Sequence, residues 1–214
     1  MLASRFYRLT QSRRHGAGGF AFAASPSCPA PQARLLWDAR YDGSVLPVEA
    51  VPASGRQADT FDLGRLSSLA TVVARPDGGE CVVLSDGYRH IRIDVVSGTL
   101  RGGPVRLFYN LQGFARVEEK ILTLRRFLAL CRLGRFARDL HPREHQAPRW
   151  LAALRALDAA NQGASQREIS SILFGEKLIG SARDSGSDFL RLRVQRLVRS
   201  GKKMVAGGYL SLLR

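Results

Sequence analysis

The stretch from residue 44 to residue 109 consists of short apolar segments, several of them β-branched, that are separated by turn sequences. The β-branched segments Ala70–Ala74 and Glu80–Leu84 flank the turn sequence PDGG, which is typical of a hairpin. In His90–Val96 the apolar residues occupy every second position, which predicts another strand. With extended segments before and after them, these strands predict that residues 34–113 form a small antiparallel β domain, either a meander or a small barrel.

From residue 115 onward the period changes from two to about 3.6. Ile121, Leu124, Leu128 and Cys131 recur at helical spacing, and we expect them to form the buried stripe of a helix that stops at Gly134. A second helix is predicted over Trp150–Ala160, where Leu151, Leu154 and Leu157 recur every third residue. We therefore expect residues 114–214 to form a helical domain, and the fold class to be α+β.

Two further helices are predicted near the C-terminus. Ser165 and Glu168 fit a capping box at the start of the first, and Phe174-Gly175 ends it. Ser187 and Asp188 are predicted to cap the second. Its residues Leu190, Val194, Leu197 and Gly201 fall on one face at 100° per residue, with Val198 on the flank. Arg196, Arg199 and Lys203 fall on the opposite face, bordered by Gln195 and Lys202, and no acidic residue follows Asp188.

The connection between these helices, from Phe174 to Gly186, is longer than the usual helix-turn-helix turn of 3–4 residues. We expect either an elaborated motif or an extra turn of helix there.

The charge of the chain bears on the interpretation of the last predicted helix, which carries Arg196, Arg199 and Lys203. The chain has 33 lysines and arginines against 18 acids, a net charge of +15. Residues 111–214 hold 20 of the cations and 9 of the acids, so the excess is concentrated in the helical half. Such a surface attracts polyanions, and the planar arginine side chain suits both phosphates and guanine edges. The alternative is a solvated basic face.

Residues 1–33 are predicted to form a basic and flexible N-terminal arm. They contain no acid and several arginines. Two alternatives stay open, the remnant of an upstream module and a targeting segment.

Catalytic and metal-binding patterns give little support to other functions. The chain has no GxSxG, HExxH or phosphate-loop sequence, so we expect no enzyme, no cofactor and no small-molecule substrate. His141 and His145 are four residues apart, but Pro142 lies between them, and we predict no metal site. The three cysteines are scattered, which favours a reducing compartment, and no apolar run is long enough to cross a membrane.

Several segments together resemble a known family. The sequences REISSILFG (Arg167–Gly175), SDFLRLRVQRLVRSG (Ser187–Gly201) and GGYLSLL (Gly207–Leu213) resemble the RovC-like DNA-binding domain family, as do GYRHIRIDVVSG (Gly87–Gly98) and GPVRLFYNLQG (Gly103–Gly113). The resemblance covers roughly residues 34–213. It implies a bacterial, cytoplasmic, nucleoid-associated transcription regulator with a C-terminal helix-turn-helix-like unit, and it also implies a homo-oligomer.

The sequence therefore predicts a sequence-specific regulator that binds double-stranded DNA. The predicted DNA-binding residues are Gln166, Arg167, Ser187, Arg191, Arg193, Gln195, Arg196, Arg199, Lys202 and Lys203. Two alternatives remain. The fold could serve as a protein-interaction module without DNA binding, in which the basic face meets an acidic partner. A recombinase would instead need Tyr209 as its nucleophile.

Overall fold

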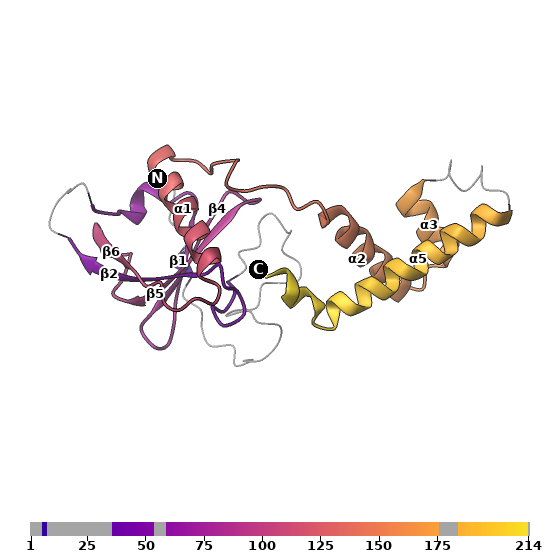
Figure 1. Cartoon of the computed structure of the whole chain (residues 1–214), viewed down its shortest axis with the longest axis horizontal. Helices are drawn as coiled ribbons and strands as arrows, with labels where there is room; N and C mark the ends of the chain where they lie inside the picture. Colours follow the sequence, from indigo (N-terminus) through magenta and orange to yellow (C-terminus); the bar gives the residue numbers. More distant parts are fainter. Residues whose placement is uncertain (1–5, 8–35, 54–58, 176–183, 214) are drawn as a thin grey trace. The chain divides into compact units, whose positions relative to one another are not determined.

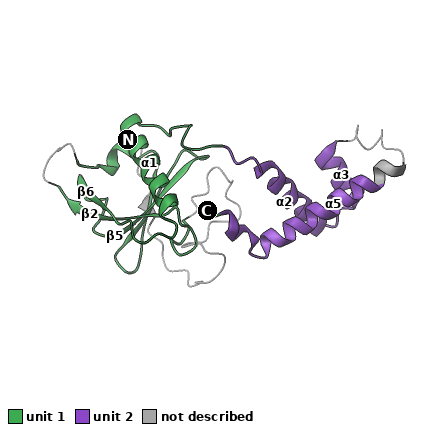
Figure 2. Ribbon diagram, viewed as in Figure 1, with its two compact units in different colours: residues 1–142, 213–214 green, residues 143–212 purple. Residues whose placement is uncertain are grey.

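The computed structural model describes residues 6–7, 36–53, 59–175 and 184–213 (Figure 1). The chain divides into two compact units. The first comprises residues 1–142 with 213–214, and the second comprises residues 143–212 (Figure 2). Strands dominate the first unit and helices make up the second, so the α+β class is confirmed. Of the predicted arm at residues 1–33, only Phe6–Tyr7 lies within the described residues, as a short strand.

The first unit is built on one six-stranded sheet. Its strand order is β1-β3-β4-β5-β2-β6. The antiparallel run β3-β4-β5 matches the predicted meander, but β2 runs parallel to β5, as β1 does to β3, so the sheet is mixed rather than wholly antiparallel. The reason is that β2 inserts between β5 and β6. The strands are β1 (Phe6–Tyr7), β2 (Leu46–Pro52), β3 (Ala70–Ala74), β4 (Glu80–Ser85), β5 (His90–Ser97) and β6 (Val105–Tyr109).

Helix α1 (Val117–Leu133) belongs to this first unit and packs on the sheet. Phe127 and Leu130 are buried in the sheet's core, and the Phe127 ring meets Phe61 edge-on with 5.1 Å between centroids. The stripe predicted for this helix is therefore wrong in part: Leu124 packs against the core, but Ile121, Leu128 and Cys131 are exposed. Ile121 and Leu128 are 37% and 36% exposed, because burial follows the side chains that reach the sheet rather than the most regular apolar spacing. The predicted stop is confirmed, since Gly134 caps the helix in the left-handed conformation.

A buried carboxylate joins β4 to the chain segment after β5. The side chain of Glu80 is only 1% exposed. It accepts hydrogen bonds from the Thr99 hydroxyl at 2.6 Å, from the Leu100 amide at 3.0 Å and from Arg101 Nε at 2.6 Å. A buried charge is tolerated only when it is paired and hydrogen-bonded, and these three donors supply both conditions.

The second unit consists of α2 (Ala147–Asn161), α3 (Gln166–Phe174), α5 (Asp184–Val205) and the short 3₁₀ turn η2 (Gly208–Leu212). Helices α2 and α5 lie side by side (Figure 1). Small residues make their contact, since Ala153 and Ala156 are fully buried whereas Leu151, part of the predicted stripe, is half exposed. Gly201 of α5 is also buried, and a Cβ built there would lie 2.6 Å from the Ala153 carbonyl oxygen.

Candidate nucleic-acid interface

Helix α5 has one buried face, as its sequence period predicts. Leu190 and Val194 are buried, Leu197 is half-buried, and Val194 packs with Ala156 of α2 and Ile169 of α3. This apolar stripe fixes which side of the helix faces away from the rest of its unit. Because the helix turns 100° per residue, the side chains half a turn away must point outward.

The helix begins earlier than the sequence indicates. Ser187 and Asp188 are not its cap, because α5 starts at Asp184 and includes both residues. Residues 184–186 thus extend the helix by about one turn before Ser187. Ser187 therefore lies inside the helix, where its side chain is not among those described. The connector residues 176–183 lie outside the described residues.

The outward side of α5 carries a dense set of cations. Arg196, Arg199, Lys202 and Lys203 are all exposed, and Gln195 is exposed beside them. We call these four residues the cationic face. In the part of the chain that the structure describes, no carboxylate forms a salt bridge with any of them. Lys202 and Lys203 also lie in the last turn, where positive charge is favoured by the helix dipole.

Two of the predicted DNA-binding arginines contact α3 instead of standing free. Arg191 Nε donates a hydrogen bond of 3.1 Å to the side-chain oxygen of Gln166, in the first turn of α3. The guanidinium carbon of Arg193 lies 4.2 Å from the centroid of the Phe174 ring, at the other end of α3. A cation over an aromatic face stabilises the contact by about 0.5–1 kcal/mol at an exposed site. These arginines hold the two helices in register.

The start of α3 carries the predicted capping box. The Ser165 hydroxyl accepts from the Glu168 amide, and the Glu168 carboxylate accepts from the Ser165 amide at 2.7 Å. The Ser165 hydroxyl also donates a hydrogen bond of 2.7 Å to this carboxylate, and that bond together with the one from the Ser165 amide lowers the pKa of Glu168, so its carboxylate stays charged. A negative charge there opposes a phosphate at this helix end, although Arg167 beside it is exposed. The start of α3 is therefore a weaker phosphate site than the cationic face.

Two other side chains singled out in the sequence have local structural surroundings. The Nδ1 atom of His141 lies 2.9 Å from the Ala137 carbonyl oxygen, and the ring meets Phe136 edge-on. Tyr209 is half-buried in η2 and follows Gly207, which has a positive φ of 109°, and Gly208, where the sequence predicts the end of the last helix. Both positions fit packing roles.

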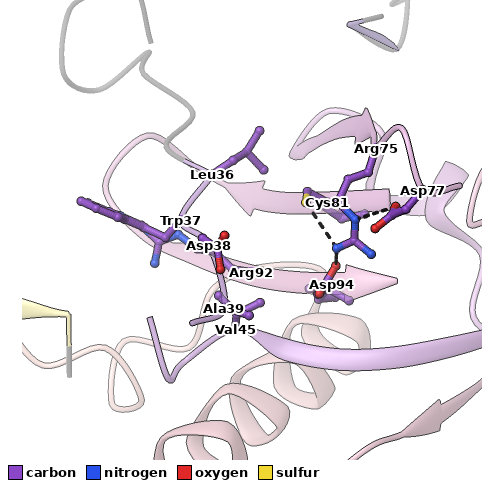
Figure 3. Close-up of a pocket in the computed structure, with 12 residues that line it drawn as sticks. Leu36, Trp37, Asp38, Ala39, Val45, Arg75, Asp77, Cys81, Arg92 and Asp94 are labelled. Carbon is purple, nitrogen blue, oxygen red and sulfur yellow. Dashed lines mark hydrogen bonds and ion pairs between the residues drawn. The ribbon is translucent and has the colours of Figure 1, made fainter. Parts of the chain in front are cut away.

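A pocket of about 280 Å³ lies in the first unit, lined by residues of β4 and β5, by the turn between β3 and β4 and by the segment before β2 (Figure 3). Arg75 pairs there with Asp77 and Asp94, and its Nη1 lies 4.0 Å from the Cys81 sulfur. Burial raises the pKa of Cys81 to about 11, so the thiol stays protonated at neutral pH. The pocket's charges satisfy one another, which leaves Arg75 poorly placed to bind phosphate.

Among the described residues, no helix combines the length and the apolar character that a bilayer span requires.

Comparison with known proteins bears on the helical half of the chain. Residues 112–214 match the model of a family described as a T6SS transcription factor DNA-binding domain. A search of curated proteins returned no match. The matched segment contains α1, the connection that follows it, and all of the helices of the second unit.

Proposed function

Residues 112–214 belong to the RovC-type family of T6SS transcription-factor DNA-binding domains, and from this premise we propose that α5 is the element that contacts duplex DNA. A DNA-binding regulator is the general function that the family carries, and its class is not an enzymatic one. Our proposal concerns which residues of this chain contact DNA. Gln195 and the cationic face meet the duplex, and binding is sequence-specific.

One observation carries the proposal. Helix α5 is anchored on one side by Leu190 and Val194 and carries on its other side four exposed cations with no described counter-acid. A rigid helix with cations on one face suits the phosphate backbone, which supplies most of the affinity. Arginine and glutamine side chains on such a helix can also read base edges in the major groove.

Arg191 and Arg193 have a different role in this proposal. Their contacts with Gln166 and Phe174 hold α3 against α5, so α3 and α5 act as one helix-turn-helix-like unit with an elongated connection. The site is thereby divided into positioning arginines near the start of α5 and contacting cations in its second half. A cytoplasmic location is part of the same proposal, because a regulator must reach the chromosome.

The test is binding to a mixed-sequence duplex across a salt series. Each phosphate contact contributes about 0.9 to the slope of log affinity against log salt. We expect Arg196→Ala/Arg199→Ala to flatten the slope by about 1.8. The matched control is Arg40→Ala/Arg89→Ala, which removes two arginines that already pair with Asp38 and Asp86. Selection of bound duplexes from a random pool then tests sequence specificity.

Absence of wild-type binding at low salt would overturn the proposal. It would favour a protein-interaction module whose basic face meets an acidic partner. Binding that is equally steep in the α5 variant and in the control would instead show that α5 is not the contacting element.

A further inference from the structure

The first unit has a basic surface of its own, which is distinct from the cationic face of α5. The positive charge of this unit is concentrated outside its sheet. Residues 36–119 contain nine arginines and eleven acids, whereas residues 120–142 contain six lysines and arginines and one acid, Asp139. The change of sign coincides with helix α1 and the segment that follows it. A net charge of +5 over 23 residues is thus concentrated outside the sheet.

Six of the nine arginines in residues 36–119 form ion pairs in the structure. Arg92 pairs with the buried Asp42 at 3.0 Å, and Arg101 pairs with Glu80 at 2.6 Å. The remaining described pairs in this region are Arg40–Asp38, Arg75–Asp77, Arg75–Asp94, Arg89–Asp86 and Arg116–Glu119. These cations are held by partners within the protein and would have to break those contacts to bind an external anion.

Four arginines beyond residue 120 are in a different situation. None of them forms a salt bridge with a carboxylate of the described residues, and all four are exposed. We call them the α1–loop cluster, and they are Arg125, Arg132, Arg135 and Arg138. Arg125 and Arg132 are seven residues apart on one helix face, which places them about 10 Å apart along the helix.

The backbone that carries the cluster is held in place. Between Arg135 and Arg138, the side chains of Phe136 and Ala137 are buried, and Phe136 belongs to the core under the sheet. Arg126 Nε donates a 2.7 Å hydrogen bond to the Leu140 carbonyl oxygen, which ties this segment back to α1. The exposed arginines are therefore presented from a fixed loop, and little backbone entropy is lost when they bind an anion.

We infer that the α1–loop cluster is a second phosphate-binding surface, which contacts the DNA backbone outside the region read by α5. This inference rests on the proposed function. The family match supports it, because the matched DNA-binding segment starts at residue 112 and so includes the cluster, although the cluster lies in the first compact unit. Backbone contacts of this kind add affinity without adding sequence information.

The experiment uses the full-length chain and a long mixed-sequence duplex. Two variants test the cluster, Arg125→Gln/Arg132→Gln on the helix and Arg135→Gln/Arg138→Gln on the loop. The matched control is Arg40→Gln/Arg89→Gln, which alters the net charge equally on the same unit at arginines that are already paired. Thermal unfolding of every variant checks that the fold is retained, which the exposure of the four side chains predicts.

We expect each cluster variant to flatten the salt slope by up to about 1.8, and the control to leave it unchanged. The relative affinity for different sequences should stay the same. If both cluster variants behave like the control while Arg196→Ala/Arg199→Ala still flattens the slope, the inference is overturned and the proposed function stands. If the cluster variants flatten the slope and the α5 variant does not, the inference stands and the assignment to α5 fails.

Discussion

Gly201 offers a test of how α5 is held in place. The substitution Gly201→Ala adds one methyl group where α5 crosses α2. That Cβ would lie 2.6 Å from the carbonyl oxygen of Ala153 and 2.9 Å from the Cβ of Leu157. Both atoms belong to α2, and the nearer one is backbone, so neither can move by a simple side-chain rotation. The helices must separate to accept the methyl group.

Two opposing effects decide whether Gly201→Ala raises or lowers the free energy of unfolding. Alanine is favoured over glycine inside a helix by about 0.8–1 kcal/mol. Overpacking a well-filled contact costs about 1–3 kcal/mol, and the upper part of that range applies where backbone must move. The separation also loosens the cluster of Ala156, Ile169 and Val194. We therefore expect a net loss of about 1–2 kcal/mol in the free energy of unfolding of the helical unit.

Thermal and urea unfolding, followed by the helical circular dichroism signal, measure this loss. For a unit of this size, a loss of 1 kcal/mol lowers the Tm by about 4–8 °C. The matched control is Ser200→Ala at the neighbouring half-buried position, which gains helix propensity and adds no atom to the side chain. A Gly201→Ala protein as stable as the wild type, or more stable, would refute the close crossing of α2 and α5.

Three further predictions concern single side chains. Glu80→Gln should lower the free energy of unfolding by about 2–4 kcal/mol in urea denaturation, because the buried acceptor of Arg101 loses its charge. The control Glu49→Gln, at a partly buried carboxylate that accepts from Asn110, should lower the free energy of unfolding by less. Desolvation lowers the pKa of His141 below its ordinary 6.5, and its Nε2 is buried without a described hydrogen-bond partner. The unfolded chain then binds the proton more readily, so the Tm should fall as the pH drops below about 6.5, and His141→Gln should weaken that dependence while His145→Gln retains it. Arg193→Ala should lower the free energy of unfolding by about 0.5–1 kcal/mol, because its guanidinium packs on the Phe174 ring. The salt slope of DNA binding should stay unchanged, and a slope flattened by about 0.9 would show that Arg193 contacts a phosphate instead.

Local patterns in the sequence determined much of this protein. The β-branched segments on either side of the PDGG turn predicted β3 and β4, and the alternation of apolar residues predicted β5, each to within one or two residues. The capping box of α3 and the glycine stop of α1 were also readable, since both depend on residues within one turn. The buried and exposed faces of α5 followed from its 3.6 period.

Other features depended on contacts between residues far apart in the chain. Which side of α1 is buried was decided by the fit of Phe127 and Leu130 to the sheet, and the regular spacing of Ile121 and Leu128 predicted the other side. The parallel pairing of β2 with β5 has no signature within either strand.

Which arginines of α5 contact other side chains was likewise decided by the tertiary structure. In the sequence, Arg193 and Arg196 are both predicted DNA-binding cations of one helix. In the structure the guanidinium of Arg193 lies over the Phe174 ring, whereas Arg196 forms no salt bridge or ring contact with the described residues. The physical reason is that sequence determines charge and periodicity, while the neighbours that neutralise or bury a charge come from other elements, which only the folded chain brings together.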